Sequence, residues 1–147
     1  LIIKVSRLYT NSLEDEQDLF QEIVLQLWRS YDSFKGQSKI STWMYRVALN
    51  TAITLFRKKT KSPQTDELMD FHHSGYMEDD DEKQQQVSLL YKVIKMLPQV
   101  ERAIVMMYLD DLPYRDISEN LGITEVNARV KMNRLKKTLK ELMEKHA

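Results

Sequence analysis

The stretch LPYRDISENLGITEVNARVKMNRLKKTLKELMEK, residues 112–145, carries the pattern of two helices joined by a tight turn. Ile117 and Leu121 are spaced as one face of a short helix, and Gly122 suits the left-handed residue that ends it. Thr124 is a good N-cap for the longer helix that follows. The spacing therefore predicts a helix-turn-helix unit.

The longer helix separates an apolar seam from a basic surface. The seam recurs in steps of four and three residues, at Ala128, Met132, Leu135, Leu139 and Leu142. Residues 128–140 hold six Lys or Arg side chains, and no acid lies between Val126 and Lys140. A solvated helix face usually mixes both signs in i,i+4 pairs, so this bias, together with the helix-turn-helix spacing upstream, favours a polyanionic partner. The alternative is a solvated face whose cations complement the helix dipole.

Composition favours helices throughout. The chain has 147 residues, 42% hydrophobic and 30% charged, with only three Gly and three Pro for the tight turns that sheets require. It has no Cys, which excludes disulfides and thiolate metal sites. No apolar run approaches the roughly 20 residues that span a bilayer, and the opening LIIKVSRLYT lacks a signal-peptide cleavage site. We expect an all-α, soluble, cytoplasmic protein without membrane insertion.

The formal charge is zero overall but uneven along the chain. Residues 1–61 hold ten Lys or Arg and six Asp or Glu (+4), and residues 87–147 hold eleven and eight (+3). Between them, residues 62–86 hold one and eight (−7), without sustained apolar periodicity. Such a segment is typical of a solvated linker. We therefore predict two small helical domains, 1–61 and 87–147, joined by a flexible acidic linker, 62–86.

Residues 1–61 are predicted to form a small bundle of three helices. Ser12 suits the N-cap of the second helix, with acids in its first turn. The expected buried stripe of this helix comprises Phe20, Ile23, Val24, Leu27, Trp28 and Tyr31. The expected buried stripe of the third helix comprises Ile40, Trp43, Met44, Val47, Thr51 and Leu55. Tyr45 and Arg46 lie off this stripe and are expected to face a ligand.

Residues 87–111 are predicted to add two further helices to the second domain. The first is expected to bury Val87, Leu90, Tyr91, Ile94 and Leu97. Pro98 suits the start of the next. That helix is expected to bury Ala103, Ile104, Met107 and Tyr108.

Three blocks of the chain resemble a known family. Region 2 of bacterial sigma factors of the extracytoplasmic-function group is similar to EDEQDLFQEIVLQLW (14–28) and SFKGQSKISTWMYRVALNTAITLFRK (33–58). Region 4 of the same group is similar to LPQVERAIVMMYLDDLPYRDISENLGITEVNARVKMNRLKKTL (97–139). The resemblance implies a transcription initiation factor rather than an enzyme, without cofactor or metal. It also implies that core RNA polymerase and double- and single-stranded promoter DNA are its partners, and an anti-sigma factor its inhibitor.

By this resemblance the second helix docks on the clamp helices of the polymerase large subunit, and the second domain on the polymerase flap. The residues at the matching docking positions are Asp15, Asp18, Gln21, Glu22 and Trp28. Asp18, Gln21 and Glu22 offer acceptors to basic groups of a partner. Acids placed at a helix N-terminus by the dipole are the alternative reading.

The resemblance also places promoter contacts in both domains. The expected minus-10 residues are Phe34, Lys35, Gly36, Tyr45, Arg46, Asn50, Arg57 and Lys58. The expected minus-35 residues are Thr124, Asn127, Arg129, Lys131, Asn133, Arg134, Lys136 and Lys137. Flipped bases stack on aromatic rings, Asn and Arg read base edges, and the remaining cations bind phosphates.

Three other functions are weighed against this one. A metal hydrolase built on His72, His73 and the acids at 78–82 lacks an ordered shell to fix the geometry. An ordinary helix-turn-helix repressor does not explain the polymerase-docking block. A sigma mimic that binds an anti-sigma partner without binding promoter DNA has no use for base readers such as Asn50 and Arg129.

Overall fold

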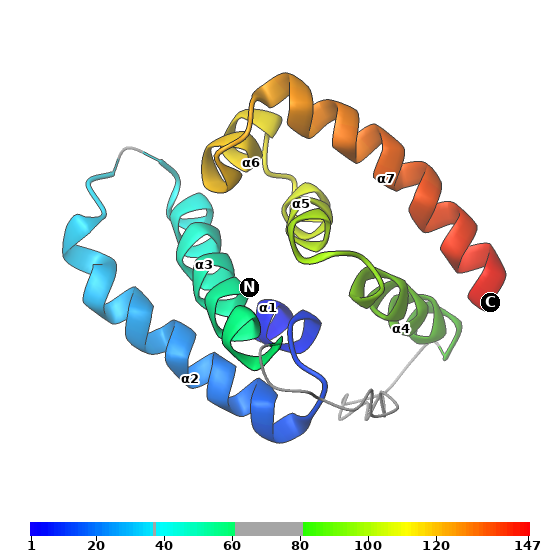
Figure 1. The fold of residues 1–147 in the computed structure, drawn as a ribbon, viewed down its shortest axis with the longest axis horizontal. Coiled ribbons are helices and arrows are strands. Elements are labelled where there is room, and N and C mark those ends of the chain that lie inside the picture. Colours follow the sequence, from blue (N-terminus) through cyan, green and yellow to red (C-terminus); the bar gives the residue numbers. More distant parts are fainter. Residues whose placement is uncertain (37, 61–80) are drawn as a thin grey trace. The chain divides into compact units, whose positions relative to one another are not determined.

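The computed structural model describes residues 1–36, 38–60 and 81–147, without the side chains of residues 56–60. Two compact units divide the chain, Leu1–Asp70 (unit 1) and Phe71–Ala147 (unit 2). Every regular element in the described ranges is a helix (Figure 1). The expected all-α class is confirmed. Within those ranges, no helix combines the length and the apolarity needed to cross a membrane.

Unit 1 packs three α-helices against one another. Its elements are α1 (Ile2–Leu8), α2 (Leu13–Ser30), the 3-10 turn η1 (Tyr31–Ser33) and α3 (Ile40–Thr60). The α1, α2 and α3 helices contact one another in all three pairs. As the sequence predicts, the Ser12 hydroxyl caps α2, accepting from the Asp15 backbone N–H at 3.1 Å.

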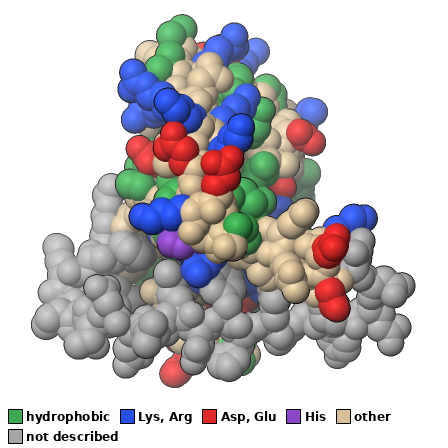
Figure 2. Space-filling view, turned by 90° about the vertical axis from the view of Figure 1, so that its right-hand side faces the viewer, with side chains coloured by type: hydrophobic (Ala, Val, Ile, Leu, Met, Phe, Trp, Pro, Cys, Tyr) green, Lys and Arg blue, Asp and Glu red, His purple; other side chains and the backbone are tan. Residues whose placement is uncertain are grey.

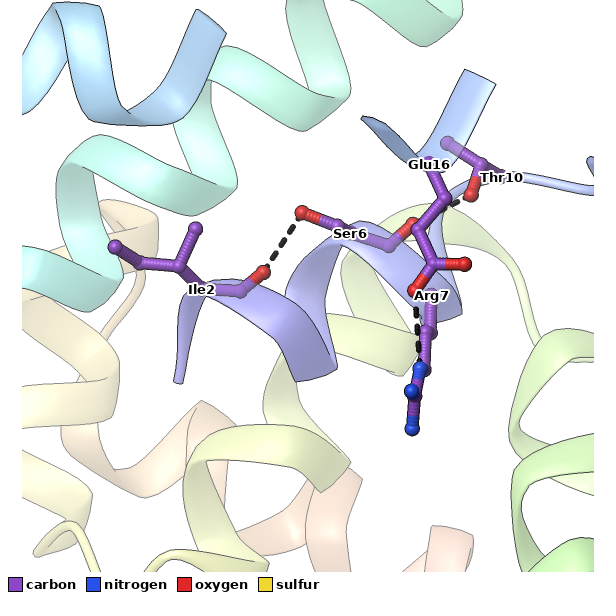
Figure 3. Close-up of polar contacts among 5 residues, drawn as sticks. All are labelled: Ile2, Ser6, Arg7, Thr10 and Glu16. Carbon is purple, nitrogen blue, oxygen red and sulfur yellow. Dashed lines mark hydrogen bonds and ion pairs between the residues drawn. The ribbon is translucent and has the colours of Figure 1, made fainter. Parts of the chain in front are cut away.

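Two hydrogen bonds within residues 2–10 and one ion pair to α2 surround the short α1 (Figure 3). The Ser6 hydroxyl donates to the Ile2 carbonyl at 2.7 Å, and the Thr10 hydroxyl donates to the Ser6 carbonyl at 2.5 Å. The Arg7 guanidinium forms an ion pair with Glu16 on α2, with Nε and Oε1 2.9 Å apart. This pair is partly exposed, so we attribute the packing of α1 mainly to its buried Val5 and Leu8.

The helix faces that unit 1 buries differ from those expected. On α2 the fully buried residues are Leu19 and Ile23, whereas Phe20, Val24 and Trp28 are exposed. On α3 the buried residues are Thr42, Tyr45, Ala48, Leu49 and Ala52. Each helix carries two neighbouring apolar stripes of equal period, and tertiary packing rather than side-chain size selects the inner one. Small Ala48 and Ala52 allow close approach of the backbone, so the core prefers their face.

Unit 2 begins earlier than expected. Its first helix, α4 (Asp81–Lys95), includes residues 81–86, which the charge pattern predicts as part of the linker. Asp81 and Glu82 occupy the first turn, where acids complement the helix dipole, and the Lys and Gln residues that follow are good helix formers. Val93, Ile94 and Leu97 are buried at the end of α4, whereas Val87 is exposed. The remainder of the expected linker lies outside the described residues.

The centre of unit 2 is α5 (Gln99–Leu109), which contacts α4, α6 (Tyr114–Leu121) and α7 (Glu125–His146). Residues 102–107 are buried on all sides of this helix. Arg102 is the charged member of that run, and its Nη2 donates to the carbonyls of Lys95 at 2.8 Å and Leu97 at 3.1 Å. One guanidinium therefore provides hydrogen-bond donors to carbonyl groups at the end of α4 and in the turn that follows it.

The turn between α6 and α7 has the expected chemistry. Gly122 adopts a left-handed conformation with φ of 69°, and the Ile123 N–H donates to the Ser118 carbonyl at 3.1 Å. The Thr124 hydroxyl accepts from the Asn127 backbone N–H at 3.1 Å and so caps α7. The predicted helix-turn-helix geometry is thus present in the structure.

Replacing Arg102 by Gln tests the α4–α5 connection. We expect the free energy of unfolding of unit 2 to fall by about 1–3 kcal/mol, because the part-buried hydrogen bond to Lys95 and the buried one to Leu97 lose their charged donor. Urea unfolding followed on NMR signals of unit 2 measures the loss. Arg115→Gln is the matched control, since Arg115 lies on the surface in an exposed pair with Glu119. Equal stability of the two variants would contradict the assignment.

Candidate nucleic-acid interface

The inner face of α7 determines which of its residues reach the surface. Ala128, Met132, Leu135 and Leu139 are buried against the rest of unit 2, as the sequence predicts, and Leu142 is half-buried. The helix contacts α4, α5 and α6. Because this seam is continuous over three turns, the orientation of α7 about its own axis is fixed.

The outer face of α7 is strongly basic and also exposes Val126 and Val130. The expected minus-35 residues other than Lys131 are all exposed, and Lys131 is half-buried. Figure 2 faces the right-hand side of Figure 1, where α7 lies, and Lys and Arg side chains gather in the upper part of that view with acids beneath them. A side-chain surface of this type attracts a polyanion.

Two cations of this face are in contact with aromatic rings of neighbouring helices. The Arg129 guanidinium lies 5.1 Å from the centroid of the Tyr114 ring and 3.4 Å from Glu125 Oε1. The Lys136 ammonium lies 4.7 Å from the centroid of the Tyr108 ring. A hydrogen bond with the Tyr108 side chain raises the pKa of Lys136 above its usual value. Lys136 is therefore fully charged at neutral pH.

In unit 1, an aromatic cluster forms where η1 leads into α3. The Trp43 ring lies 5.1 Å from the Phe34 ring and 6.4 Å from the Tyr31 ring, measured between centroids. Lys35 and Gly36 next to it are exposed, and Gly36 has φ of 70°, which favours glycine. Sequence reasoning treats Trp43 and Tyr31 as core residues. The structure leaves Trp43 half-buried and Tyr31 exposed.

Asn50 lies on the same face of α3 as Trp43 and Arg46, at i+7 and i+4 from them. Asn50 is exposed and Arg46 is half-buried. Phe34, Lys35, Arg46 and Asn50 therefore have part or all of their side chains at the surface of unit 1. Arg57 and Lys58 lie within α3, and their side chains are outside the described residues.

Tyr45 is a correction to the expected minus-10 set. Its side chain is 1% exposed and is among the largest fully buried side chains of the described residues. The cause is the inner face of α3, which presents Tyr45 between Thr42 and Ala48 toward the core. A ring in this position does not stack on a base. Of the α3 aromatic side chains that the structure describes, Trp43 is the accessible one.

The outer face of α2 combines acceptors with uncovered apolar side chains. Asp18 and Gln21 are exposed, and Asp15 and Glu22 are half-buried. Glu22 accepts a hydrogen bond from Gln26 at 3.0 Å. Beside them, Phe20, Val24 and Trp28 follow one another at i, i+4 and i+8, with Trp28 82% exposed. The described residues of unit 1 leave this apolar stripe, Phe20–Val24–Trp28, between 37% and 82% exposed.

The residues considered for a metal centre fall mostly outside the structure. His72, His73 and residues 78–80 are not among the described residues, and Asp81 and Glu82 are exposed at the start of α4. Among the residues that are described, no group of three or more His, Cys, Asp or Glu side chains has the geometry of a metal site.

Comparison with known families matches both units. Residues 1–62 match the family described as sigma-70 region 2, and residues 88–139 match sigma-70 region 4. The two matches occur in the same order as the structural units and together account for most of the chain. The chain belongs to the extracytoplasmic-function group of the sigma-70 family. The expected family is thereby confirmed.

Individual sigma factors show moderate similarity. The extracytoplasmic-function sigma-E factor of Haemophilus influenzae is 28% identical over 130 residues, covering 79% of this chain and 69% of that protein. SigZ of Bacillus subtilis is 27% identical over 128 residues, covering 86% and 72%. SigG of Mycobacterium tuberculosis is 41% identical over 54 residues, which is 37% of this chain and 15% of SigG. The chain thus spans a small part of SigG and about 70% of the other two.

Two solved structures share the fold. The sigma factor RpoE, in a complex with the anti-sigma factor NepR from Bartonella quintana, aligns with a TM-score of 0.76 at 19% identity, over 97% of this chain and 89% of RpoE. CnrH, in a complex with the cytosolic domain of CnrY, aligns with a TM-score of 0.67 at 15% identity, over 99% and 82%. At these identities the similarity establishes the fold.

Replacing Tyr45 by Ala separates a core role from a base-stacking role in this sigma factor. We expect the free energy of unfolding of unit 1 to fall by about 3 kcal/mol or more, because a large buried ring leaves a cavity. Asn50→Ala, a change at an exposed site of the same helix, should stay within about 0.5 kcal/mol. Urea unfolding followed on NMR signals of unit 1 measures both. A Tyr45→Ala variant as stable as the parent chain would show that the ring is not in the core.

Proposed function

We propose that this chain is a transcription initiation factor that binds core RNA polymerase and directs it to promoters with specific minus-10 and minus-35 elements. Such a factor acts in the cytoplasm, without catalytic activity of its own. The observation that carries the proposal is the outer face of α7, where a helix held by a helix-turn-helix unit exposes Arg129, Asn133 and Arg134 together. The family match and the exposed Asn50 of unit 1 support it.

The outer face of α7 fits double-stranded promoter DNA. In a helix-turn-helix unit the second helix lies in the major groove with its N-terminal residues toward base edges. Arg129 and Asn133 supply the side chains that recognise guanine and adenine in pairs of hydrogen bonds, each worth about 1–3 kcal/mol of discrimination. Lys131, Arg134, Lys136 and Lys137 then neutralise phosphates, and Thr124 and Asn127 add contacts at the helix start.

The aromatic cluster of unit 1 fits melted single-stranded DNA. Unstacking a base costs a few kcal/mol, and stacking on an aromatic side chain returns about 1–3 kcal/mol per base. Phe34 and Trp43 offer that surface, and Asn50 offers both donors and acceptors to a base edge. Lys35 and Arg46, with Arg57 and Lys58 further along α3, are assigned to phosphates.

The outer face of α2 fits the polymerase clamp. The Phe20–Val24–Trp28 stripe provides the apolar centre of an interface, and Asp15, Asp18, Gln21 and Glu22 provide its polar rim. An aromatic side chain as exposed as Trp28 is typical of the residues that dominate binding energy once covered. The flap contact is assigned to unit 2 by family resemblance.

An anti-sigma factor is a further proposed partner. RpoE and CnrH, which share this fold, were solved with the anti-sigma factor NepR and with the cytosolic domain of CnrY, respectively. A sigma mimic that binds such a partner and no DNA is the second candidate function. The exposed Asn50 of α3 and the exposed Arg129 and Asn133 of α7 favour promoter binding over this second candidate.

Run-off transcription with core polymerase and a promoter library tests the proposal. The chain should produce start sites that core polymerase alone does not, and Arg129→Ala or Asn50→Ala should reduce those transcripts about tenfold, because each removes one base contact. Lys145→Ala, at an exposed site near the end of α7, is the matched control and should keep full activity. A library without new start sites, together with tight binding to an anti-sigma factor, would favour the mimic.

Replacing Trp28 by Ala tests the docking face. Affinity for core polymerase should fall at least tenfold, because a covered Trp at the centre of an interface is worth about 2 kcal/mol or more. The matched control is Ile3→Ala, which shortens another exposed apolar side chain of unit 1. Equilibrium binding to immobilised core polymerase measures both. Equal affinities for the two variants would place the polymerase elsewhere on the chain.

A further inference from the structure

Two tyrosine rings lie side by side at the junction of α5 and α6. Tyr108 belongs to the last turn of α5, and Tyr114 is the first residue of α6. Between them the chain reverses through Asp111, whose φ of 62° is left-handed, and through the N-cap Pro113. The two ring centroids are 6.1 Å apart with an angle of 31° between the planes. The turn therefore creates one continuous aromatic surface from two helices.

Two cations of α7 rest on this aromatic surface. Arg129 lies over Tyr114 and Lys136 lies over Tyr108, at 5.1 and 4.7 Å from the ring centroids. The cations are seven residues apart, so they share one side of α7, immediately beside the buried Ala128 and Leu135. Both distances are within the roughly 6 Å over which a cation is attracted to an aromatic face.

We propose that Tyr108 and Tyr114 are positioning residues of the DNA-binding face, which hold Lys136 and Arg129 over their rings before DNA arrives. This inference rests on the proposed function. Glu125 also contacts this guanidinium, with its Oε1 3.4 Å from Arg129 Nη2. In this role neither Tyr108 nor Tyr114 needs to contact a base.

The physical basis is the conformational freedom of long cationic side chains. Free Arg and Lys side chains each carry about 2 kcal/mol of rotamer entropy, part of which is lost on ordering at an interface. A guanidinium held over the Tyr114 ring has fewer orientations open to it, and bidentate recognition of guanine depends on the orientation of the guanidinium. An ammonium held by Tyr108 needs position but no plane, which suits a phosphate contact.

Two changes at Tyr114 separate the ring from its hydroxyl. Tyr114→Phe retains the aromatic face over which Arg129 lies, whereas Tyr114→Leu retains an apolar side chain without that face. Tyr91→Leu, a half-buried tyrosine on α4, serves as the matched control for a general loss of stability. Thermal unfolding of each variant accompanies every binding measurement.

The first measurement uses the full chain without DNA. Ring currents should shift the side-chain NMR resonances of Arg129 upfield in the parent chain and in Tyr114→Phe. The shift should be lost in Tyr114→Leu and unaffected in Tyr91→Leu. An Arg129 side chain without a ring-current shift in the parent chain would overturn the proposal, whatever happens in transcription.

The second measurement uses a duplex selected by the full chain from a random-sequence pool. Tyr114→Leu should weaken binding about two- to fivefold, the range of an exposed cation–π contact, and should relax selection of guanine at one position. Tyr114→Phe should bind as the parent chain does. In an Arg129→Ala background Tyr114→Leu should have no further effect, which shows that the ring acts through Arg129. The salt dependence should not change, because no charge is removed.

The outcomes distinguish this inference from the proposed function. If Tyr114→Leu leaves affinity and base preference unchanged while the chain still selects a sequence and initiates transcription, the proposed function stands and the positioning role is rejected. If the chain selects no sequence at all, minus-35 recognition and the positioning role are rejected together. If Tyr114→Phe loses as much as Tyr114→Leu, the hydroxyl rather than the ring is responsible, and the cation–π assignment is rejected.

Discussion

The burial of the α7 seam against the other helices of unit 2 is the contact on which this interface depends. Ala128, Met132, Leu135 and Leu139 allow only one rotation of α7 about its axis, and that rotation places Arg129, Asn133 and Arg134 outside. The core that receives the seam is built on α5, whose residues 102–107 are buried, and α5 is joined to α4 through the Arg102 guanidinium. Recognition chemistry at the surface is therefore set by packing inside.

The parts of the fold that sequence predicts well are those set by local chemistry. A glycine with φ of 69° after Leu121, the Thr124 cap, the Ser12 cap and the four-three spacing of α7 each follow from interactions within a few residues. Although the charge pattern predicts residues 81–86 as part of the linker, the start of α4 at Asp81 is also set by local chemistry. Its first turn is acidic and polar, and helix dipole and propensity favour it although the periodicity that reveals a buried face is absent there.

The parts that sequence predicts poorly are the choices between two adjacent apolar faces. On α2, the Phe20–Val24–Trp28 stripe has larger side chains than the Leu19–Ile23 side, yet the latter is the one that unit 1 buries. On α3, Tyr45 is expected to face a ligand but lies in the core, and Trp43 is expected in the core but lies half-buried beside Phe34. Periodicity fixes the existence of each stripe, and only the neighbouring helices, through small residues such as Ala48 and Ala52, decide which stripe is inside.

The exposure of Trp28 gives the molecule an intrinsic optical probe. The chain has two tryptophans, and Trp28 is surrounded by water while Trp43 packs against the rings of Phe34 and Tyr31. Indole emission shifts to shorter wavelength when water is removed from around the ring. Binding of a protein that covers α2 would therefore shift the tryptophan emission to shorter wavelength, so no added dye is needed to detect it. In a Trp43→Phe variant, Trp28 would be the source of that signal.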